Sequence, residues 1–281
     1  MGNRDTNINT APSTCVMLCG HERKINGKKK IECLECRSFW DINSLTQQFV
    51  YDESYPLARG HYEDSIGNLK VRTLKKWLQL SHTVVAGKVV CEVGFGGGYC
   101  LQFLNYASAK VYGIEIAEAN LSHACELGIP HDRLINFSAL PDRLPEKIDI
   151  WFFLDSFEHL ENPDQFLSWA CSVSSPGAEF LIVSPEADSL SERMLAGFWP
   201  HRVADHKFHW SRKGLIQFLE RFNMKCTLVF TPTKYVTPYV VFCHLAHKYK
   251  STFCFNALRL LPSWNVPFNI GEMGLKFTLK E

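Results

Sequence analysis

The sequence of 281 residues contains no apolar run of the roughly 18 residues that a membrane-spanning helix requires. It also has no surplus of one charge, because 30 basic residues stand beside 29 acidic residues. Such a balance argues against a protein whose whole surface binds nucleic acid, while leaving room for a local basic patch. The first residues carry no apolar core of a secretion signal. We therefore expect a cytoplasmic protein.

The composition is that of an ordinary globular protein. Hydrophobic residues make up 46% and charged residues 21% of the chain, which supplies enough apolar material for a sizeable core and excludes wholesale disorder. The length favours one large domain with a small appendage. We divide the chain into a flexible N-terminus (1–14), a cysteine-bearing module (15–40), a connector or lid (41–64) and a main domain (65–281) whose stretch 232–272 is a substrate-side insert.

Eleven cysteines in a chain without a secretion signal do not suggest disulfide bonds. Most of them are scattered among apolar stretches, where cysteine packs as a small hydrophobic side chain. Four cluster near the N-terminus in two pairs: Cys15, Cys19, Cys33 and Cys36. Asn26-Gly27 lies between the pairs and is a strong hairpin signal, so the pairs should meet. We predict a structural zinc ribbon held by these thiolates, in which His21 could replace one cysteine.

From residue 65 onward, strand-like apolar runs alternate with segments of helical periodicity. The predicted strands are 88–93, 110–115, 134–137, 148–154, 179–184, 224–231 and 275–280, the last as an antiparallel edge. The predicted helices are 65–80, 99–107, 117–127, 163–174 and 212–222. This alternation indicates an α/β fold with a Rossmann-like, mostly parallel sheet and helices on both faces.

A glycine-rich turn joins the first predicted strand of this domain to the helix behind it. Gly94, Gly96 and Gly98 let the backbone turn sharply and approach a ligand closely. Their spacing differs from that of the dinucleotide fingerprint and of the lysine-bearing phosphate loop. Glu115 ends the next strand, 17 residues after Gly98, where an acid can accept hydrogen bonds from both ribose hydroxyls of a nucleoside. The alternative is that Glu115 only caps the helix that follows.

The run Glu92-x-Gly94-x-Gly96-x-Gly98, followed by Glu115, resembles the first motifs of class I S-adenosylmethionine (SAM) dependent methyltransferases. The resemblance extends over about residues 65–231. It implies a seven-stranded sheet with a reversed final hairpin, and SAM as the cofactor. On this basis the residues expected to contact SAM are Tyr62, Glu92, Gly94, Gly96, Gly98, Glu115, Ser138, Leu140 and Asp155.

A second group of polar residues follows the strand at 148–154. Asp155, Glu158 and His159 come at its carboxyl end, which is where parallel sheets bind their ligands. The segment resembles the Glu-His motif of methyltransferases that act on small molecules, such as those of quinone biosynthesis. His159 could be the general base that deprotonates an acceptor, with Asp155 as a further candidate. Alternatively, Glu158 and His159 only orient the loop.

Histidines also gather before the last predicted helix, at His201, His206 and His209. Methyltransferases of this type carry a similar histidine on the substrate side, and His206 matches that position best. A structural or solvent-exposed histidine is the alternative. Nothing local to these three completes a convincing set of metal ligands. We therefore predict that one of the two histidines, His159 or His206, serves as a general base or holds the acceptor.

The function that these patterns favour is a SAM-dependent methyltransferase for a small or medium-sized organic acceptor, with the aromatic insert shaping the acceptor pocket. One alternative is an RNA methyltransferase, since bacterial ribosomal-RNA guanine methyltransferases also place a cysteine-rich zinc module before such a domain. Lys28, Lys29 and Lys30 on the hairpin favour it, whereas the even overall charge and the Glu-His motif argue against it. A further alternative is a SAM-binding module without turnover.

Overall fold

The computed structural model describes residues 23–26, 30–41, 64–196, 199–203, 205–236 and 266–280. Three of the predicted site residues, Cys15, Cys19 and Tyr62, lie outside the described residues. Among the residues that are described, no helix is both long and apolar enough to cross a lipid bilayer.

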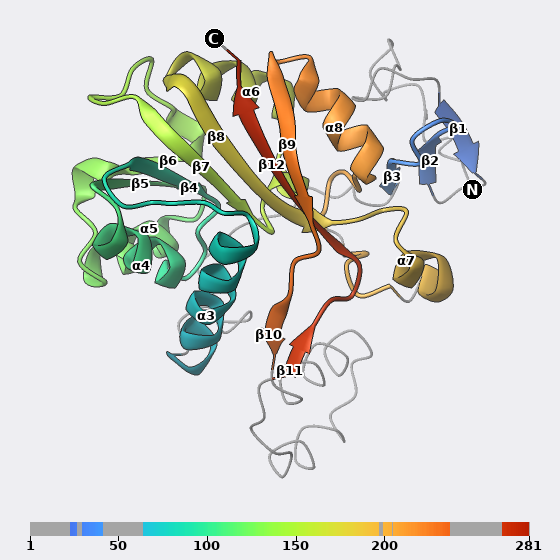
Figure 1. Cartoon of the computed structure of the whole chain (residues 1–281), viewed down its shortest axis with the longest axis horizontal. Coiled ribbons are helices and arrows are strands. Elements are labelled where there is room, and N and C mark those ends of the chain that lie inside the picture. Colours follow the sequence, from blue (N-terminus) through green and yellow to red (C-terminus); the bar gives the residue numbers. More distant parts are fainter. Residues whose placement is uncertain are drawn as a thin grey trace, which may run out of the picture.

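The centre of the molecule is a sheet of seven strands, as the resemblance implied (Figure 1). In chain order these are β4 (Val89–Val93), β5 (Lys110–Glu115), β6 (Leu134–Asn136), β7 (Ile148–Leu154), β8 (Ser174–Pro185), β9 (Met224–Phe230) and β12 (Glu272–Leu279). Their order across the sheet is β6-β5-β4-β7-β8-β12-β9. The strands from β6 to β8 pair in parallel, and β12 pairs antiparallel with both β8 and β9.

The position of β12 corrects one prediction. The sequence suggested that the last strand adds an antiparallel edge, but β12 lies between β8 and β9, and β9 forms the edge. Both faces of an inner strand are covered, and this is visible in β12, where the residues from Glu272 to Phe277 are all buried. The reversed final hairpin is confirmed.

Helices cover both faces of the sheet. They are α3 (Asp64–Leu80), α4 (Tyr99–Ala107), α5 (Glu118–Glu126), α6 (Pro163–Ser172) and α8 (Arg212–Glu220). The short helix α7 (Leu190–Leu195) lies to the side of the sheet and has no buried residue (Figure 1). Alternate residues of β7 point into two hydrophobic clusters: Ile150 and Phe152 join residues of α3 and α4, whereas Trp151 and Phe153 join residues of α6 and α8. This is why the strand reads as a continuous apolar run in the sequence.

The predicted insert begins and ends in a second, smaller sheet. β10 (Lys234–Val236) and β11 (Val266–Phe268) pair antiparallel, and the residues between them lie outside the described part. The hairpin base is fixed to α3, because the Trp77 indole donates a hydrogen bond to the Thr233 carbonyl over 3.0 Å and the Tyr235 N–H donates one to Thr73 Oγ1 over 3.0 Å. Figure 1 shows this small sheet beside α3. The sequence prediction of a substrate-side insert did not include this strand pair.

The N-terminal residues form a three-stranded sheet of β1 (Arg23–Asn26), β2 (Lys30–Cys33) and β3 (Phe39–Asp41). β1 and β2 pair antiparallel, with Asn26 opposite Lys30, so the predicted hairpin is present, and its turn lies outside the described residues. The described part of this module packs against the main domain. Ile31, Cys33 and Cys36 are buried in the same hydrophobic cluster as residues of α6 and α8. Figure 1 shows β3 next to the start of α8.

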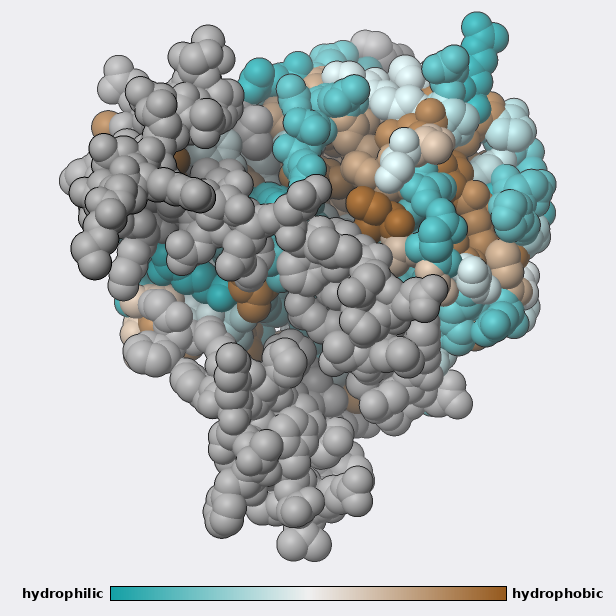
Figure 2. All heavy atoms as spheres, turned by 180° about the vertical axis from the view of Figure 1, so that it is seen from behind, coloured by the Kyte–Doolittle hydropathy of each residue, from teal (hydrophilic) through white to brown (hydrophobic). Residues whose placement is uncertain are grey.

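On the face shown in Figure 2, hydrophilic and hydrophobic side chains of the described residues are interspersed. Three of the described residues with exposed large hydrophobic side chains, Leu190, Met194 and Leu195, lie on α7, whereas the others, such as Tyr106, are spread over other parts of the fold. Single exposed apolar side chains of this kind are usual on folded proteins.

Candidate functional site

The glycine turn after β4 has the backbone geometry that the sequence predicted. Gly94, Gly96 and Gly98 have φ angles of 70°, 55° and 77°, which lie in the left-handed region that favours glycine. At Gly94 the reason is also steric, since an added Cβ would lie 2.6 Å from Ser156 Cβ at the end of the neighbouring strand. The turn therefore brings the β4 loop against the β7 loop, directly before the amino end of α4.

Glu115 sits at the end of β5 and is nearly buried. One carboxylate oxygen accepts a hydrogen bond from the Gly96 N–H over 2.9 Å, and the other accepts from the N–H groups of Ile116 and Ala117 over 2.8 and 3.2 Å. The acid thus holds the glycine turn and also satisfies N–H groups just before α5. Oε1 already accepts two bonds, whereas Oε2 accepts only one, so acceptor capacity for a ligand hydroxyl remains at Oε2.

Glu92 is the acid that precedes the glycine turn, and its side chain is only 3% exposed. Its Oε2 atom has no hydrogen-bond partner among the described residues. Burial raises the pKa of Glu92 to about 8, with Lys70 lowering it and Glu115 raising it to a lesser extent. A buried acceptor without a partner beside a glycine turn fits a ligand that brings an N–H or ammonium donor.

At the end of β7, Asp155 takes a left-handed backbone conformation with φ of 56°. Lys234 of β10 reaches both of its carboxylate oxygens, over 2.9 and 2.8 Å, and also pairs with Glu272 over 2.9 Å. His201 approaches Glu272 over 3.2 Å. Burial alone would raise the pKa of Glu272, but Lys234 and His201 lower it to about 2. This network fixes the base of the insert to the carboxyl edge of the sheet, and sequence reasoning did not find it.

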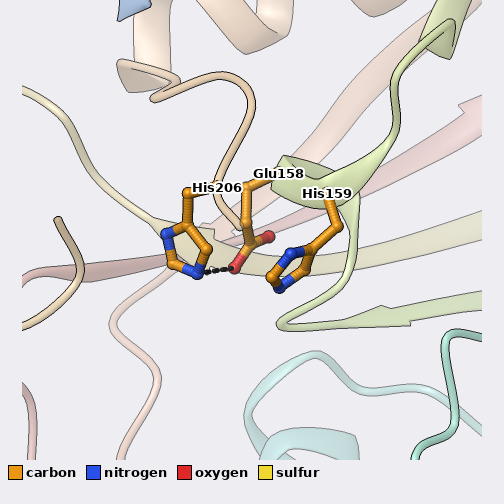
Figure 3. A group of neighbouring side chains, drawn as sticks. All are labelled: Glu158, His159 and His206. Atoms are coloured by element: carbon orange, nitrogen blue, oxygen red, sulfur yellow. Dashed lines mark ion pairs between the residues drawn. The ribbon is translucent and has the colours of Figure 1, made fainter. Parts of the chain in front are cut away.

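The two histidines expected at the acceptor side do meet (Figure 3). The rings of His159 and His206 cross edge to face with centroids 4.7 Å apart, and Glu158 Oε1 lies 3.9 Å from His206 Nε2. They come from the loops after β7 and β8, which are neighbouring parallel strands. The His159 Nδ1–H donates to the Asp205 carbonyl over 2.9 Å, which leaves its Nε2 as the ring acceptor.

Glu158 is the buried centre of this cluster, with 1% of its surface exposed. Ser184 of β8 donates a hydrogen bond to Oε2 over 3.0 Å. Burial, followed by the charge of Asp155, raises the pKa of Glu158 to about 8. A carboxyl that titrates this close to neutrality beside two imidazoles can store and pass a proton.

Comparison with known proteins decides the family. A model of the methyltransferase domain family matches residues 68–229, which is more than half of the chain. The chain belongs to this family. A ubiquinone biosynthesis O-methyltransferase of Stutzerimonas stutzeri (strain A1501) is 32% identical over 108 residues, 37% of this chain and 46% of the relative. That of Pseudomonas fluorescens (strain SBW25) is 32% identical over 100 residues, 34% of this chain and 43% of the relative. The chain thus spans about half the length of these relatives.

Solved structures agree on the fold of this methyltransferase domain. A putative methyltransferase of Bacillus halodurans C-125 superimposes with a TM-score of 0.52 at 18% identity, over 74% of this chain and 99% of the other. A chain from the complex between the Haloferax volcanii Trm112 methyltransferase activator and a putative methyltransferase gives a TM-score of 0.55 at 15% identity, over 83% of this chain and 100% of the other. At such identities the likeness concerns the fold alone.

Ser138 and Leu140 are the remaining described residues that were expected to contact SAM. Ser138 lies exposed in a short helical turn after β6, where its N–H donates to Asn136 Oδ1 over 2.8 Å. Leu140 is partly buried and packs against the cluster on the side of α6 and α8. Both stand beyond β6, at the edge of the sheet beside the Glu115 strand. Their contact with adenine stays a prediction.

One expectation about the histidines of this methyltransferase domain needs correction. No metal-ligand set was expected around His201, His206 and His209, and indeed His201 pairs with Glu272 while His209 stacks on Phe39 with ring centroids 4.5 Å apart. However, Glu158, His159 and His206 place one ligand atom each within 4.8 Å of one another, so this set could hold a metal ion. Local inspection missed it because the ligands come from two loops.

The buried acid Glu92 leads to a prediction about stability. Its pKa of about 8 in the folded methyltransferase lies above the usual value near 4.5, so the folded state holds the proton more tightly than the unfolded state. Stability should therefore fall as the pH rises from about 4.5 to about 8. We expect Glu92→Gln to be more stable than the wild type above pH 8 by a few kcal/mol, with the advantage shrinking toward pH 5.

Urea unfolding of both proteins at pH 5, 7 and 9 measures this difference. Glu126→Gln is the matched control, because Glu126 is an acid on the exposed part of α5 with 76% of its side chain accessible. Stability curves of wild type and Glu92→Gln that run parallel across this pH range would contradict the raised pKa.

Proposed function

We propose that the protein is a methyltransferase that uses SAM to methylate a small organic acceptor, through a hydroxyl oxygen. The glycine turn together with Glu92 and Glu115 is the observation that carries the proposal. It offers a close backbone approach, an acceptor for ribose hydroxyls and a buried acid for an amino group, in the order that a nucleoside joined to methionine requires. The curated relatives, which are O-methyltransferases of ubiquinone biosynthesis, favour oxygen as the acceptor atom.

When bound, SAM supplies a sulfonium methyl group that is already electrophilic. The chain therefore has to position the partners, exclude water and remove the acceptor proton. We assign proton removal to His159, whose Nε2 is the ring acceptor because its Nδ1–H is held by the Asp205 carbonyl. The His206 ring contacts His159, and Glu158 lies beside His206. This pair can take up that proton, since the pKa of Glu158 is raised to about 8. Lys234 holds Asp155 in place at the carboxyl end of β7.

The test is transfer of label from methyl-labelled SAM by the full chain into a cell extract split into a small-molecule fraction and an RNA fraction. We expect label in the small-molecule fraction only. Label in RNA that declines steeply with salt would instead establish the RNA methyltransferase, because phosphate contacts weaken with salt. SAM binding without transfer to either fraction would point to a non-catalytic module. Arms with chelator and with added divalent ions show whether the Glu158 cluster works with a metal.

We further propose that the N-terminal cysteines hold one structural zinc ion. The side chains of Cys33 and Cys36 are both buried, and the Cys36 N–H donates to Cys33 Sγ over 3.4 Å. The two thiols thus lie in one tight turn, which is a usual way to present a pair of zinc ligands. Cys15 and Cys19, the other proposed ligands, lie outside the described residues.

Metal analysis of protein purified without chelator should find about one zinc per chain. The variant Cys33→Ser should lose it, whereas Cys226→Ser, which changes a cysteine of β9 far along the chain, should keep it. Full alkylation of all four N-terminal thiols in metal-free protein that remains folded would rule this site out.

A further inference from the structure

The N-terminal sheet is joined to the loop that carries His206. We call residues 205–211, which connect to α8, the His206 loop. The Phe39 N–H of β3 donates to the His209 carbonyl over 2.9 Å, and the His209 N–H donates back to the Phe39 carbonyl over 2.8 Å. This pair of bonds forms a one-residue bridge between β3 and the loop. The Phe39 side chain is fully buried and stacks on the His209 ring.

A buried serine pair adds a second connection at the start of α8. The Ser211 N–H donates to Ser38 Oγ over 2.9 Å, and the two hydroxyl oxygens lie 3.1 Å apart. Ser211 in turn caps α8, since its Oγ accepts from the Gly214 N–H over 3.0 Å. The fit is close, because a Cβ at Gly214 would lie 2.2 Å from Ser38 Oγ and 2.8 Å from Cys36 Sγ. The cysteine turn therefore packs directly on the first turn of α8.

The His206 loop also contacts Glu158 and His159, which together with His206 form the acceptor-side cluster. The Lys207 N–H donates to the Glu158 carbonyl over 2.9 Å, and the Asp205 carbonyl accepts from His159 Nδ1 over 2.9 Å. His206 thus stands on a short loop held between Glu158 and β3. A shift of the loop along β3 would move His206 relative to Glu158 and would also change the bond that sets the His159 tautomer.

We propose that Ser38 and Phe39 are positioning residues for the acceptor-side histidines, so that the cysteine-bearing module sets the geometry of the proton-accepting cluster without touching the acceptor. The cysteine turn takes part because Cys36 Sγ lies 3.2 Å from Ser38 Oγ. Zinc held by Cys33 and Cys36 would stabilise the bridge from the turn through Ser38 to Ser211. The effect on turnover rests on the proposed methyl transfer, whereas the positioning of the histidines does not.

The experiment compares Ser38→Ala with Ser174→Ala in the full chain. Ser174 is a matched control, because its buried hydroxyl also makes two hydrogen bonds, with the Trp151 indole over 2.8 Å and the Ala170 carbonyl over 2.7 Å, at the far end of β8. The readout is the pH titration of the histidine ring signals by NMR, together with the affinity for SAM. We expect Ser38→Ala to shift the titrations of His159 and His206, and Ser174→Ala to leave them at their wild-type positions.

Once an acceptor has been identified, Ser38→Ala should also lower kcat by about ten-fold, while the SAM dissociation constant stays unchanged. Small misplacements of reacting groups slow the chemical step strongly. If Ser38→Ala does not fold, Phe39→Leu supplies the same comparison, because it removes the ring stacked on His209 and keeps the backbone bridge. Unchanged titrations of His159 and His206 in the variant that folds would overturn the proposal. Shifted titrations in a protein that methylates nothing would uphold it and contradict the proposed function instead.

Discussion

The variant Glu115→Ala should bind SAM ten-fold to more than a hundred-fold more weakly than the wild type. A hydrogen bond to a charged acceptor contributes about 1.5–3 kcal/mol, and the ribose is expected to offer this acid two hydroxyl donors. The exchange also frees the Gly96 N–H, which Glu115 Oε2 holds over 2.9 Å, so the glycine turn loses part of its fixed shape. Calorimetric titration of both proteins with SAM measures the change.

Two further variants show which part of the Glu115 side chain matters and whether the loss of another acid nearby has the same effect. Glu115→Gln keeps one acceptor oxygen but places an amide donor where the other oxygen accepts backbone N–H groups, so an intermediate loss is expected. Glu126→Ala, on the exposed side of the next helix, should bind SAM as the wild type does. If Glu115→Ala keeps its affinity, the acid serves only the glycine turn and the start of α5.

Removing the acceptor-side histidines is the second change with a large expected effect. A general base contributes typically about 10²–10⁴-fold to turnover, whereas a residue that only orients a loop contributes less. At least one of His159→Ala and His206→Ala should therefore lose more than about 10²-fold in kcat while its SAM affinity stays near that of the wild type. We expect the larger loss for His159, whose Nε2 is the ring acceptor. Single-turnover kinetics with the identified acceptor measure this step.

His131→Ala is the control, because His131 is exposed in the short helix before β6. If both cluster variants turn over the acceptor at near wild-type rates, neither histidine is catalytic. Methyl transfer would then rest on positioning, or on Asp155 at the end of β7. That outcome can be checked with Asp155→Asn, which keeps the size of the side chain and removes its charge toward Lys234.

Much of the fold could be predicted because each signal is local. Apolar runs such as Ile148–Leu154 mark strands that are buried on both faces, and the three left-handed glycines follow the first of these strands directly. The meeting of His159 and His206 was also predictable, since both loops leave the carboxyl ends of neighbouring parallel strands. In these cases the sequence position of a residue nearly determines its place in the sheet.

Other features depend on contacts between distant segments, and sequence patterns do not record these. Lys234 belongs to a short strand at the base of an insert, and only the folded chain shows that it bridges Asp155 and Glu272. The burial that raises the pKa of Glu158 depends on the loops packed around it. Likewise, Phe39 of β3 pairs with His209, which lies far along the chain.

The measurement that tests the account most directly is a crystal structure of the full chain with S-adenosylhomocysteine, the product of methyl transfer from SAM. We predict both ribose hydroxyls within hydrogen-bond distance of Glu115, the amino group on Glu92, and the sulfur atom facing the cluster of Glu158, His159 and His206. A ligand bound elsewhere, or one whose sulfur faces away from these histidines, would contradict the account.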